Sequence, residues 1–195
     1  MDIEYEAKFL EIDKDEMRER LKKAGAHLER PEYSQKRIPL YLPKEKNDKH
    51  SWLRVRDEGD KITLSLKTVD GEGIEGQKEI CLEVDNFDNA VKLLEAIGCT
   101  IKSYQETKRE LWKLDGADIT IDTWPFLEPF IEIEASSEEA VKAAAAKLGF
   151  DYAKAVFGGV GKVYKMKYGI PPDEVNDLPK LVFDMENPFH HAHWP

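Results

Sequence analysis

The first nine residues alternate between two kinds of side chain with the period of a β-strand. In the stretch 3–9, Glu4, Glu6 and Lys8 occupy every second position, and the positions between them are apolar or aromatic. An extended chain would project the charged trio from one face and the apolar residues from the other. The segment is therefore predicted to be a strand that packs on a core with one face and meets water, a metal or a ligand with the other.

The size and the proline distribution indicate the domain organisation. The chain has 195 residues, of which 41% are hydrophobic, and this is enough for one sizeable domain. Glycine and proline gather at 169–172, and prolines recur at 179, 188 and 195. We therefore expect one domain over 1–168 and a Pro-rich C-terminal tail over 169–195 that either wraps the surface or stays loose.

The charge balance and the cysteines argue against several classes of protein. A formal net charge of -10 repels phosphate backbones, which argues against a generic nucleic-acid binder. The sequence has no run of about 18 apolar residues and no basic and apolar leader at its start, so we expect no membrane association and a cytoplasmic location. Cys81 and Cys99 lack metal-ligand spacing and are interpreted as small, semi-buried hydrophobic residues.

Three segments share one organisation, in which a short strand with alternating acids precedes a polar helix start and a helix that ends near glycine. Asp13 is the expected N-cap of the first helix, and Ser136 with Glu139 has the spacing of a capping box before the third. Three amphipathic helices need a sheet to cover. Their expected apolar faces are Met17, Leu21 and Ala24; Phe87, Ala90, Val91, Leu94 and Ile97; and Ala140, Val141, Ala144 and Leu148.

Period-two alternation and turn signals predict the sheet. Glu58-Gly59-Asp60 indicates a hairpin between the alternating stretches 53–56 and 62–67, and Leu114-Asp115-Gly116 indicates another before 118–122. Hairpins imply antiparallel pairing, so the expected fold class is α+β with an antiparallel sheet.

The face of this sheet that no helix covers would carry both acids and bases. In an open sheet these charges would face bulk water and contribute little beyond solubility. In a closed barrel they would line an interior and need a charged ligand and ions to balance them. So many charges on corresponding faces of several strands favour the lined cavity. The residues concerned are Glu4, Glu6, Lys8, Arg54, Arg56, Lys67, Glu79, Asp122, Glu132 and Glu134.

The order of these motifs resembles the CYTH superfamily, also called triphosphate tunnel metalloenzymes. The resemblance covers about residues 2–165, and the stretch 123–134 is most similar to bacterial members described as class IV adenylyl cyclase-like, which are relatives of thiamine triphosphatases and inorganic triphosphatases. The motifs that carry it are Glu4-x-Glu6-x-Lys8, Arg54-x-Arg56, Lys67, Arg109, Asp122 and Glu132-x-Glu134.

The resemblance implies a closed, eight-stranded antiparallel β-barrel that forms a tunnel, with helices outside and a small-molecule triphosphate held inside by basic side chains and Mg²⁺ or Mn²⁺. Glutamates suit such hard cations, and without substrate Lys8 is expected to pair with a neighbouring glutamate. The implied phosphate-binding residues are Lys8, Arg54, Arg56, Lys67, Arg109 and Lys162. The implied metal ligands are Glu4, Glu6, Glu79, Asp122, Glu132 and Glu134, and the implied catalytic residues are Lys8, Glu4 and Asp122. The first metal shell is expected to be Glu132, Glu134 and Glu6, and Asp122 taken alone could instead cap a strand end.

Two positions depart from the family pattern. Thr107 stands where a Lys-x-Arg pattern ending at Arg109 would have lysine, which removes one expected phosphate contact, and Lys108 is expected to lie outside the barrel. Cys81 stands where a second acid would follow Glu79, which changes the charge balance of the tunnel.

Two further motifs are set aside. The stretch 156–162 resembles a phosphate-binding loop but lacks its first glycine, and Val163 follows the lysine where serine or threonine would hold magnesium. A loop into a final strand at Val163-Tyr164 is expected instead, with Lys162 before it. His190-His191-x-His193 has the spacing of a transition-metal site, but it lies in the tail and is interpreted as adventitious.

Three functions stay open at this point. Hydrolysis of a phosphoanhydride bond of ATP, thiamine triphosphate or tripolyphosphate is favoured because it requires no base pocket. Conversion of ATP to cyclic AMP and pyrophosphate is the alternative, and a module that binds without turnover is the third. Trp52, Trp112 and Trp124 are candidates for stacking a base, with core or rim packing as the other interpretation. Whether the protein forms a homodimer also stays open.

Overall fold

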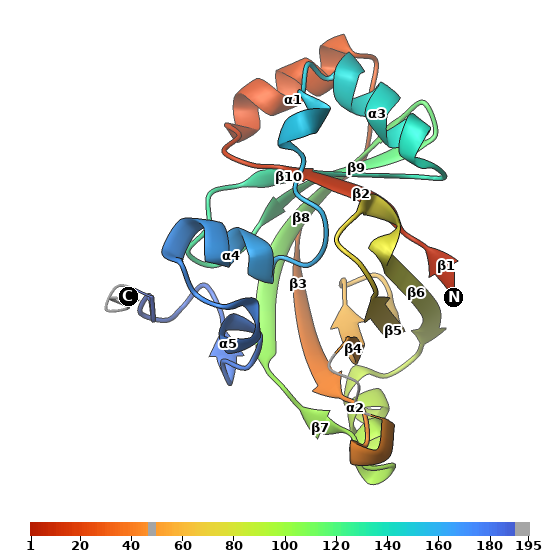
Figure 1. The fold of residues 1–195 in the computed structure, drawn as a ribbon, viewed down its shortest axis with the longest axis vertical. Coiled ribbons are helices and arrows are strands. Elements are labelled where there is room, and N and C mark those ends of the chain that lie inside the picture. Colours follow the sequence, from red (N-terminus) through yellow and green to blue (C-terminus); the bar gives the residue numbers. More distant parts are fainter. Residues whose placement is uncertain (47–49, 190–195) are drawn as a thin grey trace.

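The computed structural model describes residues 1–46 and 50–189, which form an 11-stranded sheet and five α-helices (Figure 1). The strands are β1 (Asp2–Ile3), β2 (Tyr5–Phe9), β3 (His27–Tyr41), β4 (Ser51–Asp57), β5 (Ile62–Val69), β6 (Gln77–Val84), β7 (Thr100–Ile101), β8 (Tyr104–Leu114), β9 (Ala117–Thr123), β10 (Phe130–Ala135) and β11 (Lys180–Leu181). The helices are α1 (Lys14–Lys23), α2 (Phe87–Ala96), α3 (Glu138–Lys147), α4 (Gly161–Tyr168) and α5 (Pro172–Asn176).

The sheet curls into a nearly closed β-barrel. Its strands follow the order β1-β6-β5-β4-β3-β8-β9-β10-β2, and the two strands at the ends of this order are separated in the chain by Glu4 alone. The backbone N–H of Glu4 donates to the carbonyl of Gln77 at 2.9 Å, so the wall continues across this break. With β1 and β2 taken as one interrupted strand, eight strands form the wall. The expected α+β barrel is therefore confirmed, with β7 and β11 as two-residue additions to β3 and β8.

Both predicted hairpins are present, one between β4 and β5 and one between β8 and β9. In the second, Asp115 and Gly116 have φ angles of 51° and 83°. Two consecutive left-handed residues form the kind of tight turn whose twist matches that of the flanking strands. The turn chemistry seen in the sequence thus sets the pairing of two strands that carry site residues.

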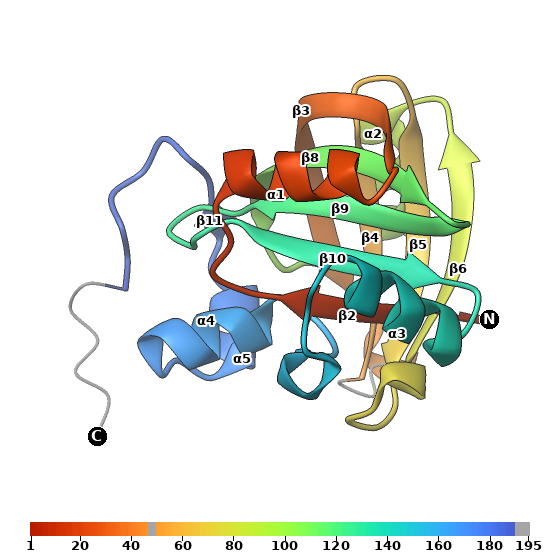
Figure 2. The same cartoon turned by 90° about the horizontal axis from the view of Figure 1, so that it is seen from above.

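Helices cover the outside of the barrel in separate groups (Figures 1 and 2). Helices α1 and α3 lie over β2, β9 and β10. Leu21 of α1, Val141 of α3 and Leu148 at the C-cap of α3 are fully buried in one apolar cluster with Ile133 of β10. Helix α2 contributes Leu94 and its neighbours to a second cluster with strands β3 and β4. The predicted N-cap Asp13 accepts from the backbone N–H groups of residues 15 and 16. The apolar side chains of the strands are thus used outside, and the polar ones face the interior.

Four local predictions were wrong. Ser137, and not Ser136, caps α3 by accepting from the N–H of Ala140 at 3.2 Å, because the helix begins one residue later than expected. Ile97 lies beyond the end of α2 and is 59% exposed. Cys81 is exposed on β6, whereas Cys99 is buried.

The fourth wrong prediction is the final strand at Val163-Tyr164, because both residues belong to helix α4. Tyr164 is fully buried in a third apolar cluster, and its hydroxyl donates to the carbonyl of Pro125 at 2.7 Å. At the start of α4, a Cβ on Gly161 would lie 2.8 Å from Pro172, so glycine permits the close approach of α4 and α5. Tertiary packing therefore decides the conformation of a short apolar pair that fits a strand equally well.

The residues after 169 pack on the barrel as far as they are described. Val175 of α5 and Leu181 of β11 are buried, and β11 pairs in parallel with β8. His190, His191 and His193 lie outside the described residues. No helix in the described ranges is long and apolar enough to cross a membrane.

Candidate functional site

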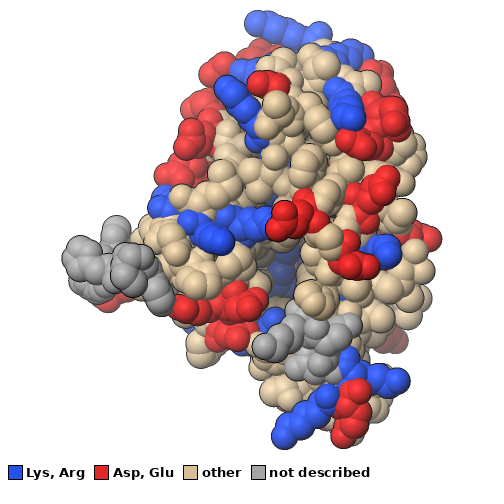
Figure 3. Space-filling model, viewed as in Figure 1, with Lys and Arg blue, Asp and Glu red and all other residues tan. Residues whose placement is uncertain are grey.

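A cavity of about 510 Å³ occupies the interior of the barrel. Figure 3 shows it as a hollow on one face of the molecule, with basic side chains in its depth and acidic ones near its rim. All twelve residues proposed from the sequence as site residues line this cavity, although their roles stay predictions. They are Glu4, Glu6, Lys8, Arg54, Arg56, Lys67, Glu79, Arg109, Asp122, Glu132, Glu134 and Lys162.

Strand parity explains why these side chains converge. In the antiparallel pair β2 and β10, Lys8 lies opposite Glu132 and Glu6 lies opposite Glu134, so all four project from the inner face. The intervening Ala7 and Ile133 are fully buried on the outer face under the helices. Every second residue of these strands therefore contributes to the cavity.

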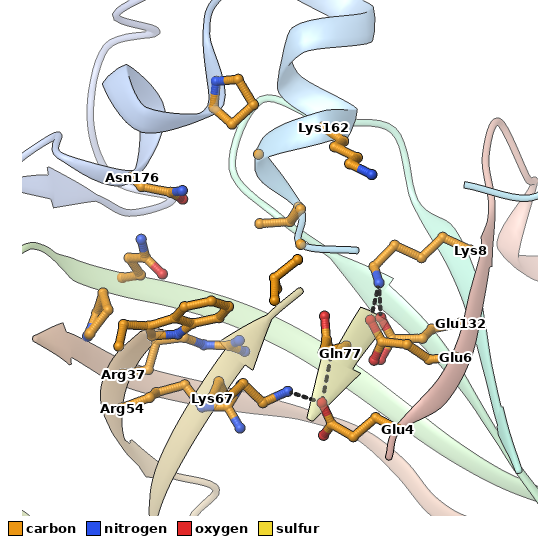
Figure 4. A pocket seen from close by; sticks show the side chains of 18 of the residues that line it. Glu4, Glu6, Lys8, Arg37, Arg54, Lys67, Gln77, Glu132, Lys162 and Asn176 are labelled. Carbon is orange, nitrogen blue, oxygen red and sulfur yellow. Dashed lines mark hydrogen bonds and ion pairs between the residues drawn. The ribbon is translucent and has the colours of Figure 1, made fainter. Parts of the chain in front are cut away.

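Lys8 stands between two carboxylates on one side of the cavity. Its Nζ lies 2.5 Å from Oε1 of Glu6 and 2.9 Å from Oε2 of Glu132 (Figure 4). Burial lowers the pKa of Lys8, but the charges of Glu132 and Glu6 outweigh this and hold the pKa above its ordinary value. Lys8 is therefore a fixed cation, paired with neighbouring glutamates as expected for the protein without substrate.

Arg109 joins this group from strand β8. Its Nε and one terminal nitrogen donate to the two oxygens of Asp122 at 2.7 and 2.6 Å, and the same terminal nitrogen reaches Glu132 at 3.2 Å. Burial raises the pKa of Glu132, but Lys8 and Arg109 together bring this pKa well below its usual range. The arrangement makes Asp122 a partner that orients Arg109.

A second group of charges surrounds Glu4. Lys67 Nζ lies 2.8 Å from Glu4 and 3.5 Å from Glu79, and Gln77 donates to Glu4 at 2.6 Å. Burial and a hydrogen bond with Glu79 raise the pKa of Glu4 to about 7. Burial also raises the pKa of Glu79. The hydrogen bond from Glu4 and the charges of Lys67 and Arg54 outweigh this effect and bring the pKa of Glu79 down to about 2. One carboxyl of this pair holds the proton near neutral pH and the other is ionised.

The raised pKa of Glu4 predicts that the metal-free protein loses stability as the pH rises. Between pH 4.5 and about 7 the folded protein holds a proton that the unfolded chain has released. The free energy of unfolding should therefore fall across this window, with a contribution from Glu4 of at most about 3 kcal/mol. Glu134, whose pKa is also raised to about 7, acts in the same direction. The lowered pKa values of Glu79 and Glu132 act below pH 4.5, outside the window.

Thermal unfolding in the presence of a chelator, from about pH 5 to about pH 8, measures this effect. In Glu4→Gln the decline should be shallower than in the unchanged protein. An identical pH dependence in the two proteins would contradict the assignment.

Glu134 completes the acidic side of the cavity near solvent. Burial of its carboxyl, followed by the charges of Glu132 and Glu6, raises the pKa of Glu134 to about 7, although the residue as a whole is exposed. Among the described residues, no group of three acidic, histidine or cysteine side chains is arranged to hold a metal as it stands. The donor chemistry fits Mg²⁺ or Mn²⁺, because glutamate oxygens that repel one another would be stabilised by a hard cation. Binding would require Lys8 to release Glu6 or Glu132.

The opposite side of the cavity is basic. Arg54 lies 3.1 Å from Glu79, and Arg56 lies 2.6 Å from Glu58. The Nε atoms of Arg37, Arg54 and Arg56 are buried and have no hydrogen-bond partner in the described part of the chain. Three unsatisfied guanidinium nitrogens in one cavity indicate a place for an anionic ligand.

Lys162 reaches the cavity from the first turn of α4. The preceding loop forms a bridge with β2, in which Lys8 and Val156 exchange backbone hydrogen bonds at 3.0 and 2.9 Å. Gly159 and Val160 also line the cavity. The segment set aside as an incomplete phosphate-binding loop thus lies at the site, but it leads into a helix and not into a strand.

The aromatic candidates separate according to strand face. Trp52 and Trp124 line the cavity, whereas Trp112 is buried in the outer cluster and donates to Glu110 at 2.6 Å. For Trp112, core packing and not stacking of a base is the correct one of the two interpretations. Lys108 lies outside as expected, over the ring of Phe183.

Several lining residues were missed. Gln35, Arg37 and Pro39 occupy every second position of β3 and share one face of the strand, and this period-two signal was available in the sequence. Val69, Gln77, Gln105 and Phe130 also lie in strands, in phase with Lys67, Glu79, Arg109 and Glu132, so the same signal was available for them. The rest come from loops and from α4 and α5, which carry no comparable pattern. The missed residues are Arg37, Pro39, His50, Val69, Gln77, Lys102, Gln105, Phe130, Gly159, Val160, Gly161, Pro172, Asp173 and Asn176.

A comparison with family models agrees with this geometry. Residues 2–156 match the model of the CYTH domain. The chain belongs to the CYTH domain family. No curated protein sequence is similar enough to count as a match.

Several solved structures share the fold at low sequence identity. A candidate adenylate cyclase from Vibrio parahaemolyticus is 14% identical with a TM-score of 0.71, and the match covers 84% of this chain and 98% of that one. The protein PH1012 from Pyrococcus horikoshii is 20% identical with a TM-score of 0.66, covering 78% and 94%. The Hippeastrum protein HpAC1, a candidate adenylyl cyclase described as having a dominant triphosphatase activity, is 18% identical with a TM-score of 0.55, covering 89% and 99%.

Proposed function

We propose that this CYTH protein is a divalent-metal-dependent enzyme that hydrolyses a phosphoanhydride bond of a nucleoside, organic or inorganic triphosphate inside its barrel. The observation that carries the proposal is the pairing, in one cavity, of unsatisfied guanidinium nitrogens with a cluster of carboxylates. A triphosphate with its cation matches both halves, because its oxygens accept from the guanidinium groups and its charge is shared with a metal held by the acids.

The basic residues would bind and orient the phosphate chain. Arg54, Arg56 and Lys67 face the cavity from β4 and β5, while Arg109 faces it from β8. Arginine presents a planar fork to phosphate oxygens, and lysine contributes a point charge. Lys8, released from Glu6 and Glu132, would stabilise the charge that develops on the phosphoryl oxygens and on the leaving group.

The acidic residues would hold the metal and accept the proton of the attacking water. A divalent cation held by Glu132, Glu134 and Glu6 would neutralise part of the substrate charge and polarise the reacting phosphoryl group. The oxygen of the attacking water forms a bond to phosphorus as the bond to the bridging oxygen breaks. Glu4, with a pKa of about 7, would accept the proton that the water loses. The role of Glu79 and Asp122 as further ligands remains a prediction.

Cyclisation of ATP is a second candidate function. Trp52 and Trp124 offer aromatic surface inside the cavity, which an adenine ring could use for stacking. The same basic and acidic residues would serve attack by the ribose 3′-hydroxyl on the α-phosphorus, with pyrophosphate as the leaving group.

Product analysis distinguishes these functions. The protein is incubated with ATP, tripolyphosphate and thiamine triphosphate in Mg²⁺ or Mn²⁺, and the products are separated by chromatography. We expect diphosphate and inorganic phosphate from at least one substrate. Cyclic AMP with pyrophosphate would establish the cyclase instead, and tight binding with neither product would indicate a module without turnover.

A further inference from the structure

Arg37 is a buried cation held entirely by neutral groups. It projects from strand β3 into the cavity and is 6% exposed. One terminal nitrogen donates to Oε1 of Gln35 at 2.6 Å and to Oγ1 of Thr107 at 2.5 Å, and the guanidinium carbon lies 4.7 Å from the centre of the Trp124 ring. The side chain is therefore fixed in one orientation.

No acid of the described residues is paired with this charge. Within the described ranges no carboxylate forms an ion pair with Arg37, and its Nε has no hydrogen-bond partner. Burial, followed by the charges of Arg56, Arg54 and Arg109, lowers the pKa of Arg37 well below its ordinary value, and the charge of Asp122 opposes this only in part. A buried charge without a counter-ion is unfavourable, so the free protein is destabilised by keeping arginine here.

The destabilisation caused by the buried Arg37 charge is explained if a ligand supplies the missing counter-ion. Figure 4 shows Arg37 next to Arg54 on the side of the cavity opposite Lys8, Glu6 and Glu132. Lys8 and Arg109 are already paired with acids, whereas Arg37 is charged, oriented and unpaired. Arg37 can therefore bind an anion without breaking an ion pair, whereas Lys8 and Arg109 would each have to break one.

We propose that Arg37 binds a phosphate oxygen of the triphosphate substrate, with Gln35, Thr107 and Trp124 as the residues that position its guanidinium group. This inference rests on the proposed function and extends it to a residue of β3. Thr107, one of the two departures from the family pattern, takes part as the hydroxyl that accepts from Arg37. Arg37 of β3 thus supplies the cation that the family pattern places at position 107 of the neighbouring strand β8.

The test is the affinity for inorganic tripolyphosphate, measured by titration calorimetry with Mg²⁺ and again with a chelator. Arg37→Gln should weaken binding by about 10- to 100-fold in both conditions, as expected for the loss of a charge-assisted hydrogen bond. The matched control is Lys36→Gln, which removes one positive charge from the opposite face of the same strand, where Lys36 pairs with Asp57. The control should bind like the unchanged protein.

A rescue variant separates a binding role from a structural one. Lysine at position 107 would place its ammonium group near the site of the Arg37 guanidinium, because Oγ1 of Thr107 already contacts that group. The double variant Arg37→Gln/Thr107→Lys should recover most of the lost affinity. Arg37→Gln should also unfold at a temperature no lower than the unchanged protein, since it removes an unbalanced buried charge. Arg37→Lys, which keeps the charge and loses the fork, should show an intermediate loss and replaces the glutamine variant if that one does not fold.

The outcomes distinguish this inference from the proposed function. If the unchanged protein hydrolyses triphosphates and Arg37→Gln binds tripolyphosphate with unchanged affinity, the inference fails and the proposed function stands. Equal losses in Arg37→Gln and Lys36→Gln, or no recovery in the double variant, would also overturn it. If the unchanged protein neither binds nor hydrolyses any triphosphate, both fail together.

Discussion

Glu134→Gln is expected to reduce metal-dependent turnover by about 100-fold or more while leaving the fold intact. The substitution removes one ligand charge at nearly constant volume. No ion pair of the described residues involves Glu134, in contrast to Glu132, which pairs with Lys8 and Arg109. Because burial, followed by the charges of Glu132 and Glu6, raises the pKa of Glu134 to about 7, the neutral amide also removes a desolvated charge and relieves repulsion among the acids. Phosphate release over a range of Mg²⁺ concentrations measures the effect.

The control for this variant is Glu139→Gln, on the exposed surface of helix α3. It makes the same chemical change away from the cavity and should keep full activity. Thermal unfolding at pH 8 should show Glu134→Gln to be at least as stable as the unchanged protein. Full turnover by Glu134→Gln at every Mg²⁺ concentration would exclude Glu134 as a metal ligand.

Arg109→Met should destabilise the protein by about 3 to 5 kcal/mol. Its guanidinium group neutralises Asp122, which is 2% exposed, and also reaches Glu132. Without Arg109, the hydrogen bond from Thr120 at 3.2 Å is the one side-chain contact that the buried Asp122 carboxylate keeps among residues 1–46 and 50–189. Urea unfolding, with the midpoint and the slope fitted separately, measures the loss.

An exposed ion pair on the same two strands provides the comparison. Lys113 of β8 and Asp118 of β9 form an ion pair in which both side chains are more than 40% exposed. Lys113→Met should therefore cost less than about 1 kcal/mol. Adding Asp122→Asn to Arg109→Met should restore part of the stability, because it removes the charge left unpaired. Similar losses for Arg109→Met and Lys113→Met would show that burial does not control the strength of the Arg109 pair.

Strand parity made much of the site predictable from the sequence. Where a strand alternates strictly, as β2 and β10 do, its apolar face must be buried under the helices. Its charged face must then point into the barrel. The same rule explains the tryptophans. Trp52 is in phase with Arg54, and Trp124 is in phase with Asp122, so each shares the inner face of its charged neighbour. Trp112 is out of phase with Arg109, and parity alone would have placed it outside.

Other parts could not be read from local patterns. Strand β3 is 15 residues long, and two prolines and the register shifts between Leu28 and Tyr33 interrupt its alternation. Only a short stretch around Arg37 keeps the period of two, and Arg37 was missed with it. Helix α4 depends on the burial of Tyr164 among residues from several elements. The charge state of Glu4 depends on its burial and on Glu79 and Lys67, which approach it only when the barrel closes. Such features arise from contacts between segments distant in the chain.

The interrupted N-terminal strand has a consequence for biosynthesis. The first nine residues leave the ribosome early, yet β2 pairs with β10, more than a hundred residues later, and β1 pairs with β6. Lys8 cannot meet Glu132 until β10 has been made. Such distant pairing is slow to form, so the wall is completed only after translation of β10, and the site is complete only when α4 and α5 have added Lys162 and Asn176 to its lining. Under the proposed function, a nascent chain arrested before β10 would thus lack triphosphate affinity, and the appearance of that affinity would report closure of the barrel.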